Sequence, residues 1–241
     1  LKLDSWSNHY AIREKRNLEK DLFPYLGSRR IGDIEPIELL AAVKQVEERG
    51  ALDVAHRVLS TAGQVWRYAV ATGRAVRDVS ADIKGALKPH HGKHFAAITD
   101  PMQLGSLIRV IRGYQGGPIV RAALQLAPIV FQRPGELRSA AWAEFDLDAA
   151  MWTIPAARMK RRVEGKKNGD PHLVPLSTQA VAILRKLHPL TGHGTLLFPG
   201  ERSHDRPISD NTVRAALLTL GYGPDVQSVH GFRATARTIL A

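Results

Sequence analysis

Residues 131–138, Phe131-Gln132-Arg133-Pro134-Gly135-Glu136-Leu137-Arg138, decide how the middle of this chain folds. The apolar run from Ile119 to Phe131 precedes them and indicates a helix, which Pro128 is expected to bend. Pro134 stands where a new helix begins, because proline in a first helical turn leaves no hydrogen bond unmade. Arg133 is therefore expected at a helix N-terminus, beside backbone donors that favour an anion.

A second polar stretch, His230-Gly231-Phe232-Arg233, opens the last helical pattern of the sequence. The spacing of three residues places His230 and Arg233 on one helical face. Taken alone, each of the two stretches is explained well by solvated surface residues or by polar residues at a helix end. Their significance depends on their occurring together in one chain.

The composition indicates a folded basic protein. The chain has 241 residues, enough for one large or two modest domains, and its hydrophobic content of 44% supports a packed core. The formal charge of +11 favours a polyanionic partner such as nucleic acid, without identifying it. The absence of cysteine excludes disulfide scaffolds and thiolate metal sites and fits a reducing compartment. Neither a signal peptide nor an apolar run of about 18 residues is found.

Residues 1–88 are expected to be helical. Glu35-Pro36 starts one helix, and Gly50 ends it. Asp53 is expected to cap the next helix, which runs to Gly73. Three arginines lie on this helix or at its end, and they form either a solvated face or a phosphate-contacting face: Arg57, Arg67 and Arg74.

The second half of the chain mixes helices with short strands. Asp100-Pro101 starts a helix, and Ser177 and Ser209-Asp210 are expected to cap two more. Residues 144–154 read as two strands and residues 172–176 as a third, with a polar loop between them. The expected fold is therefore mainly α with a small antiparallel β-sheet.

A basic linker is expected within residues 84–97. Its cationic and histidine residues are Lys84, Lys88, His90, His91, Lys93 and His94. A metal site is disfavoured, because the cluster contains no carboxylate or cysteine and zinc normally needs three or four rigidly held ligands. A segment that lies along a DNA backbone explains the composition better.

Three stretches, taken in order, resemble the tyrosine recombinases, and above all the phage-type integrases of prophages and genomic islands. They are Arg133-Pro134-Gly135-Glu136-Leu137-Arg138, a lysine-bearing hairpin, and His230-Gly231-Phe232-Arg233-Ala234-Thr235. The resemblance covers essentially the whole chain. It is also carried by Glu144 to Asp148, Trp152 to Pro155, Arg158 to Lys160, Val174 to Ser177, Leu190 to His193 and Ser209 to Thr212. It implies a helical core-binding domain at 1–88, a basic linker at 89–97 and a catalytic domain with the DNA breaking–rejoining fold at 98–241.

Phosphodiester transesterification places extra negative charge on the non-bridging oxygens of the phosphate. Two guanidiniums suit this charge, because each presents a planar fork of donors and stays protonated; Arg133 and Arg233 are the expected pair. The leaving 5′-oxygen needs a proton, which a loop lysine can supply. Lys160 occupies the family position, and Lys166 and Lys167 remain rivals because the loop is longer than in typical relatives.

His230 can donate to a phosphate oxygen or shuttle a proton near neutral pH. Glu136 has no attacking role and is expected to orient an arginine or histidine side chain. The remaining expected DNA contacts are Arg57, Arg67, Arg74, Lys88, Lys93, Arg161, Arg162 and His172.

The resemblance implies a site-specific recombinase that integrates or excises a prophage or genomic island. In this family a tyrosine attacks the phosphate, forms a 3′-phosphotyrosyl link and frees a 5′-hydroxyl, so that no metal or other cofactor is needed. The implied partners are double-stranded DNA at an attachment-site core, further copies of the recombinase on that DNA, and host DNA-bending proteins. The implied location is the bacterial cytoplasm, at the nucleoid and not in a membrane.

The sequence departs from the family at the nucleophile. The family tyrosine and a second histidine box follow the His-x-x-Arg box, and none of the five tyrosines here matches that position. The given residues are also expected not to include the arm-binding domain of related integrases. Because the chain starts without methionine and stops in a helical pattern, we expect a fragment of an active enzyme that cannot itself cleave DNA.

Three alternatives remain at this stage. A type IB topoisomerase shares the catalytic set but not the integrase-like stretches, and a non-catalytic DNA-binding module would not need both arginines and Lys160. A basic helical protein with chance motifs requires three ordered boxes to coincide. Common hydrolase and nucleotide-binding motifs are missing.

Overall fold

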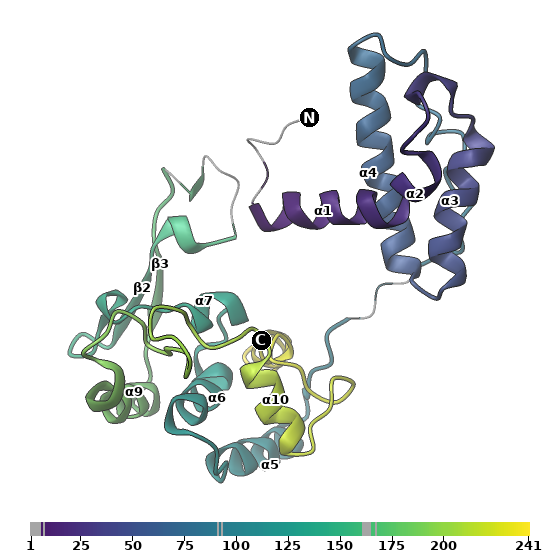
Figure 1. Ribbon diagram of the computed structural model, residues 1–241. Coiled ribbons are helices and arrows are strands. Elements are labelled where there is room, and N and C mark those ends of the chain that lie inside the picture. Colours follow the sequence, from purple (N-terminus) through teal and green to yellow (C-terminus); the bar gives the residue numbers. More distant parts are fainter. Residues whose placement is uncertain (1–5, 7, 91, 93, 161–164, 167) are drawn as a thin grey trace. The chain divides into compact units, whose positions relative to one another are not determined.

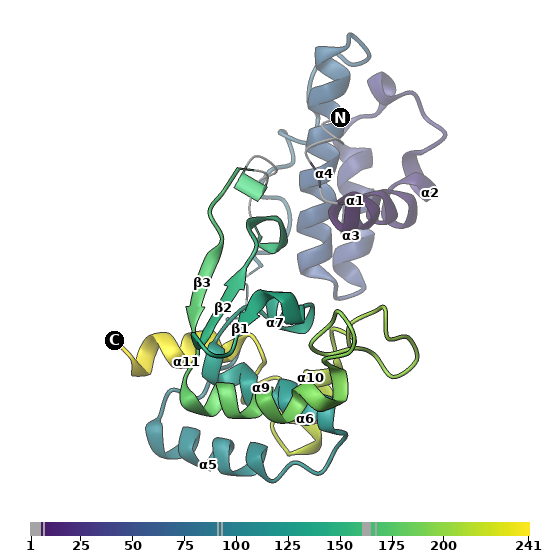
Figure 2. The same ribbon diagram turned by 90° about the vertical axis from the view of Figure 1, so that its left-hand side faces the viewer.

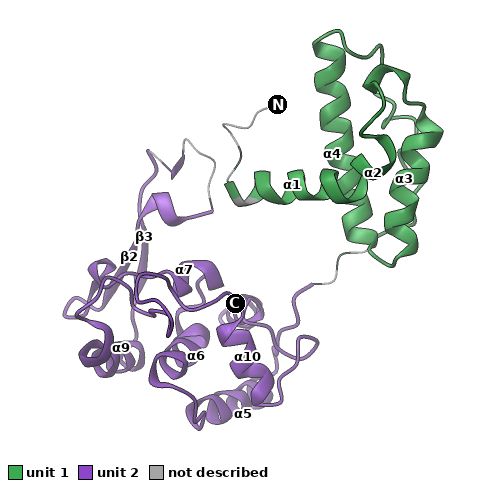
Figure 3. Ribbon diagram, in the orientation of Figure 1, with its two compact units in different colours: residues 1–93 green, residues 94–241 purple. Residues whose placement is uncertain are grey.

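The computed structural model describes all residues except 1–5, 7, 91, 93, 161–164 and 167, and it divides the chain into two compact units, Leu1–Lys93 and His94–Ala241 (Figure 3). Both units are built chiefly from helices, and unit 2 adds a three-stranded antiparallel sheet (Figure 1). The predicted fold class is confirmed. Within the described residues, no helix is long and apolar enough to span a membrane.

Unit 1 is a small helical domain. Its elements are α1 (Asn8–Asp21), α2 (Phe23–Leu26), the 3-10 turn η2 (Ile31–Asp33), α3 (Pro36–Glu48) and α4 (Leu52–Ala71). Helix α3 begins where the sequence predicts, because Pro36 takes its first position and the Glu38 carboxylate accepts a 2.9 Å hydrogen bond from the Glu35 N–H.

Helix α4 packs against α1 and α3 around one apolar core. Val43, Val58 and Trp66 are buried there. The buried Glu14 of α1 is neutralised at the edge of the core, because it pairs with Arg13 at 2.9 Å and accepts a 2.5 Å hydrogen bond from the Thr61 hydroxyl. This bond ties α1 to α4.

Two expectations for unit 1 are wrong. Residues 74–88 form turns and bends rather than helix; Gly73, with a φ of 71°, follows the end of α4, and Gly85 adopts a φ of 89° among the turns. Helix α4 begins at Leu52, one residue before the predicted cap Asp53, whose carboxylate instead pairs with Arg57 one turn later at 2.5 Å.

Unit 2 is organised around α6 (Figure 1). Its helices are α5 (Pro101–Arg112), α6 (Pro118–Val130), α7 (Pro134–Arg138), α9 (Thr178–Thr191), α10 (Thr212–Thr219) and α11 (Gly231–Ile239). Helices α5, α9, α10 and α11 all contact α6, which is why its apolar residues are buried on several sides. Pro128 lies inside α6, which continues to Val130.

The sheet of unit 2 has the order β1-β2-β3 and is antiparallel throughout (Figure 2). Its strands are β1 (Phe145–Asp146), β2 (Met151–Ile154) and β3 (His172–Pro175), with the 3-10 turns η3 (Trp142–Glu144) before β1 and η4 (Ala156–Arg158) after β2. Trp152 lies opposite Val174 and is fully buried, so one face of the sheet joins the core. All three strands lie where the sequence predicts them.

Helix capping in unit 2 follows the prediction in two places out of three. Asp100 accepts a 2.8 Å hydrogen bond from the Gln103 N–H, and the Ser177 hydroxyl accepts one of 3.3 Å from the Ala180 N–H.

The third predicted cap, at Ser209-Asp210, is wrong. Helix α10 begins only at Thr212, and the Ser209 hydroxyl bonds the Thr212 hydroxyl at 3.0 Å instead of a backbone N–H. The Asp210 carboxylate is engaged by Arg138 of α7 at 2.7 Å.

Candidate functional site

The turn between α6 and α7 places Arg133. Phe131 adopts the left-handed conformation, with φ 41°, directly after α6 ends at Val130. Such a conformation costs a non-glycine residue about 1–3 kcal/mol, so the surrounding structure must hold it in place. Pro134 then takes the first position of α7, which leaves Arg133 immediately before that helix, as predicted.

Glu136 holds Arg133 in two ways. Its carboxylate accepts a 3.1 Å hydrogen bond from the Arg133 N–H and a 2.7 Å bond from Nη1 of the same residue. Glu136 is only 4% exposed, whereas the Arg133 side chain is 38% exposed. A buried anion thus fixes the backbone and the guanidinium together, and part of the guanidinium remains open to a ligand.

Arg233 is bound to the same turn from the far end of unit 2. It lies on the first turns of α11, and its Nη1 donates a 2.8 Å hydrogen bond to the Phe131 carbonyl, two residues before Arg133. The strained turn at Phe131 is therefore a shared support for both arginines, although 100 residues separate them in the sequence.

The two arginines line one hollow of about 550 Å³. We call it the arginine pocket; its lining residues are Phe131, Gln132, Arg133, Met159, His172, Arg233, Ala236, Arg237, Leu240 and Ala241. His172, expected only as a DNA contact, thus lies in the same hollow as both arginines. Arg237 was missed, although its position four residues after Arg233 places it on the same helical face.

His230 directly precedes α11, and its imidazole interacts electrostatically with the other three predicted catalytic residues. Burial lowers the pKa of its imidazole, and the positive charges of Arg233, Arg133 and Lys160 lower that pKa further. The imidazole is therefore biased toward its neutral form near neutral pH, in which one ring nitrogen can donate and the other can accept a hydrogen bond.

Lys160 follows Arg158 by two residues, and the Arg158 side chain is held by several contacts. The preceding Arg158, at the end of η4, pairs with Glu144 and donates hydrogen bonds to the Glu136 carbonyl and, at 3.1 Å, to the Ser139 hydroxyl. Arg158 thus fastens the start of the loop to α7, while the Lys160 side chain remains exposed. Arg158 belongs to a stretch that carries the family resemblance, but its sequence context does not predict this anchoring role.

Part of that loop lies outside the described residues. Arg161 and Arg162, both expected DNA contacts, and Lys167, a rival to Lys160, fall in the undescribed segments 161–164 and 167. The other rival, Lys166, is described and is half-buried.

The expected DNA contacts of unit 1 differ in their pairing. Arg57 is engaged by Asp53 and Arg67 by Asp78 at 3.1 Å. Lys88 donates its N–H to Glu47 at 2.9 Å, and its ammonium lies 3.9 Å from the same carboxylate. Arg74 is exposed, and within the described part of the chain its guanidinium has no hydrogen-bond or ion-pair partner. Lys93 falls outside the described residues.

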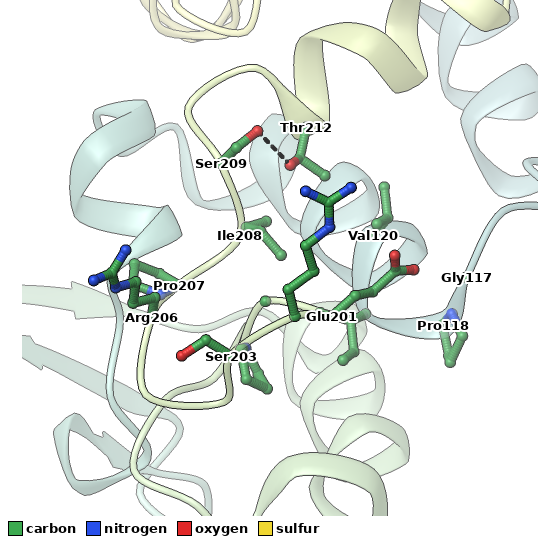
Figure 4. A pocket seen from close by; sticks show the side chains of 14 residues that line it. Gly117, Pro118, Val120, Glu201, Ser203, Arg206, Pro207, Ile208, Ser209 and Thr212 are labelled. Carbon is green, nitrogen blue, oxygen red and sulfur yellow. Dashed lines mark hydrogen bonds between the residues drawn. The ribbon is translucent and has the colours of Figure 1, made fainter.

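A different hollow, of about 430 Å³, lies between the start of α6 and the loop before α10 (Figure 4). Its lining includes Glu201 as well as Arg202 and Arg206, and its Ser209 and Thr212 hydroxyls bond each other. The mixture of charges and the satisfied hydroxyls make it a weaker anion site than the arginine pocket. No cluster of three potential metal ligands occurs among the described residues.

The geometry of the arginine pocket suits a phosphate group. Two guanidiniums can each present paired N–H donors to phosphate oxygens, and they remain charged at any working pH. The charges of both arginines and of Lys160 act on the His230 imidazole, although neither His230 nor Lys160 lines this pocket. Such a set can stabilise negative charge and supply a proton.

Comparisons with known proteins place this arrangement in a family. The phage integrase central domain matches residues 1–86, and the phage integrase family matches residues 99–241. Putative protein IntB of Escherichia coli (strain K12) is 38% identical over 237 residues, which cover 96% of this chain and 60% of that protein. The integrase of Enterobacteria phage P4 is 36% identical over 241 residues, covering 98% of this chain and 55% of that protein. The chain thus spans little more than half the length of these relatives.

Solved structures show the same fold at low sequence identity. A lambda integrase dimer bound to a COC′ core site superposes with a TM-score of 0.71 and 18% identity, over 97% of this chain and 65% of that one. The Tn1549 transposon integrase in complex with transposon right end DNA gives a TM-score of 0.70 and 13% identity, over 97% of this chain and 81% of that one.

Proposed function

The chain belongs to the phage integrase family, and we propose that it forms the DNA-binding and phosphate-activating parts of a site-specific recombinase. The whole enzyme would integrate or excise a prophage or genomic island by cleaving and rejoining DNA through a 3′-phosphotyrosine intermediate. The observation that carries the proposal is that Arg133, held by Glu136, and Arg233, bonded to the Phe131 carbonyl, line the same hollow.

Each residue of the site receives a role in this proposal. Arg133 and Arg233 stabilise the charge on the five-coordinate phosphate, and Glu136 holds Arg133 in place. Lys160 protonates the leaving 5′-oxygen, with Lys166 and Lys167 as rivals. His230 acts in its neutral form as a hydrogen-bond donor or proton shuttle. No metal or other cofactor has a part in the reaction.

The proposed domains follow the same reasoning. Residues 1–88 form the core-binding domain, residues 89–97 the basic linker, and residues 98–241 the part of the catalytic domain present here. The partner is duplex DNA at an attachment-site core, and copies of the recombinase assemble on it. Dimers and tetramers of lambda integrase on DNA support this reading. Host DNA-bending proteins complete the proposed partners, and the bacterial nucleoid is the proposed place of action.

The relatives are integrases, which disfavours the topoisomerase alternative.

The test uses a protein in which this chain is joined to a tyrosine-bearing segment of the family type. Incubated with a suicide duplex that contains the attachment core, it should form a covalent protein–DNA adduct. Arg133→Ala or Arg233→Ala should lower the cleavage rate at least about 10²-fold, the usual scale for removing one transition-state donor. DNA affinity should change far less, because each substitution removes one phosphate contact among many. Equal losses of affinity and cleavage would refute the catalytic assignment.

A further inference from the structure

The segment by which the chain enters unit 2 is bonded to the turn before α11. The Ala96 carbonyl accepts a 3.0 Å hydrogen bond from the Ser228 N–H and one of 3.2 Å from the Ser228 hydroxyl. The Ile98 N–H donates to the Gln227 side-chain oxygen at 2.7 Å, and Gln227 is 1% exposed. Because these bonds include buried groups, they fix the register of residues 95–98 against residues 227–231.

Gly231 brings this segment into direct contact with the start of α11. A Cβ atom at Gly231 would lie 2.1 Å from the Ala96 carbonyl oxygen, so any larger residue would push the two segments apart. The Gly231 N–H also donates at 2.8 Å to the Ser228 hydroxyl, the same group that bonds Ala96. The backbone beside His230 is therefore held rigidly against the entering segment.

Phe95 continues this contact at the level of side chains. Its ring lies 4.5 Å from the His230 ring, centroid to centroid, at an interplanar angle of 41°. Within the described part of the chain, the His230 imidazole makes no hydrogen bond or ion pair, so its plane is set by packing. Phe95 itself is 63% exposed, so burial of its own ring in the core does not explain its position against His230.

We propose that Phe95 is a positioning residue for His230, which holds the imidazole in its orientation beside Arg133 and Arg233 and shields it from water. Through Phe95, the entering segment thereby forms part of the wall of the hollow that His230 lines. The role of this contact in DNA cleavage rests on the proposed function, whereas the positioning of the imidazole can be tested without it.

The test measures the pKa of His230, which depends on the charged groups around the imidazole and on its burial. Arg233, Arg133 and Lys160 act on its imidazole, and Asp210, Arg214 and Tyr222 line with it and Phe95 a hollow of about 300 Å³. Burial is the largest cause of the lowered pKa of His230. Removal of the Phe95 ring should therefore raise that pKa toward the ordinary histidine range of about 6.5, while the nearby charges stay in place.

The direct experiment is an NMR titration of the His230 imidazole in this chain. Phe95→Ala should raise the pKa of His230 and remove the ring-current shift of its imidazole protons, whereas Phe95→Tyr, which keeps the ring, should retain both. Met102→Ala, at another highly exposed apolar residue of unit 2, is the matched control and should change neither. Phe95→Leu provides a second variant that keeps apolar bulk without the ring. An unchanged pKa and unchanged ring shifts in a folded Phe95→Ala protein would overturn the proposal.

The catalytic arm uses the protein joined to a tyrosine-bearing segment. Phe95→Ala should lower the rate of DNA cleavage about 10-fold, the lower range for a misplaced catalytic group. It should shift the pH profile of cleavage in the same direction as the titration, leave DNA affinity unchanged, and be rescued by Phe95→Tyr. If the tyrosine-bearing protein with Phe95 intact does not cleave DNA at all, the proposed function fails. The NMR titration still tests whether Phe95 positions the His230 imidazole. A Phe95→Ala enzyme with a normal rate and a normal pH profile would refute the catalytic role.

Discussion

The most consequential single residue after the two arginines is Glu136, because it is a buried acid whose charge is matched by one partly exposed arginine. Its carboxylate binds both the backbone N–H and the guanidinium of Arg133. Glu38 on α3 repeats the pattern on the surface: it accepts from the Glu35 N–H and pairs with Arg29. The two acids therefore allow a comparison of the same geometry in a buried and in an exposed setting.

Glu136→Gln should release the Arg133 guanidinium while preserving side-chain volume. We expect a loss of about 1.5–3 kcal/mol in the free energy of unfolding, the range for hydrogen bonds to charged groups, measured by urea denaturation. In the tyrosine-bearing protein, cleavage should fall more than DNA affinity does, because the guanidinium is misplaced rather than removed. Glu38→Gln should affect neither cleavage nor affinity. A Glu136→Gln protein with wild-type cleavage would show that Arg133 needs no such support.

At the scale of elements, the sequence predicts a helix cap correctly where the capping contact involves only neighbouring residues. Asp100 and Ser177 cap their helices as expected, since a short polar side chain before an apolar helical pattern needs no distant partner. Asp53 and Asp210 do not cap, because Arg57 and the distant Arg138 engage their carboxylates. Helix beginnings are thus predictable from sequence until a charged partner competes for the capping side chain.

The site was predictable in part for the same reason. Arg133 and Arg233 stood out through their motifs, and Arg237 was accessible from helical spacing. The hydrogen bond from Arg233 to the Phe131 carbonyl, the anchoring of Arg158 and the tilted ring contact of Phe95 with His230 join segments that are distant in the chain. No local pattern encodes such contacts, so only the folded structure reveals them.

The ion pair between Arg158 of η4 and Glu144 of η3 can be tested by a double-mutant cycle. Arg158→Met leaves the Glu144 carboxylate, 7% exposed, with the Trp152 indole N–H at 2.9 Å as its remaining hydrogen-bond donor among the described residues. We expect a loss of about 3 kcal/mol in the free energy of unfolding, since an uncompensated buried charge costs about 3–5 kcal/mol and Arg158 is itself partly exposed. Adding Glu144→Gln should recover part of that loss. Strictly additive urea midpoints would contradict the pairing.

At the scale of the whole molecule, the charge of +11 predicts DNA binding dominated by phosphates, with log affinity falling linearly as log salt concentration rises. The structure refines which cations contribute. Arg74→Ala should reduce the magnitude of the salt slope by about 0.9, the value for one phosphate contact, as measured by fluorescence anisotropy. Arg57→Ala, the matched control on α4, should reduce it less, because Asp53 already occupies its guanidinium. Equal effects, or an affinity independent of salt, would contradict this view.

The final prediction concerns covalent chemistry by the chain as given. In the proposed reaction, in-line attack requires the tyrosine oxygen to stand about 3–3.5 Å from the phosphorus of the phosphate proposed to bind the two arginines. All five tyrosines lie in the described part of the chain, and none lines the arginine pocket; they are Tyr10, Tyr25, Tyr68, Tyr114 and Tyr222. Tyr222 comes nearest in sequence to the His230 box, yet it packs against the core of unit 2. With a suicide duplex carrying the attachment core, this chain should therefore give no covalent adduct on a denaturing gel, whereas the protein joined to a tyrosine-bearing segment should give one. An adduct formed by this chain and abolished by Tyr222→Phe would place the nucleophile after α10 instead, and would require the arginine pocket to open toward that loop.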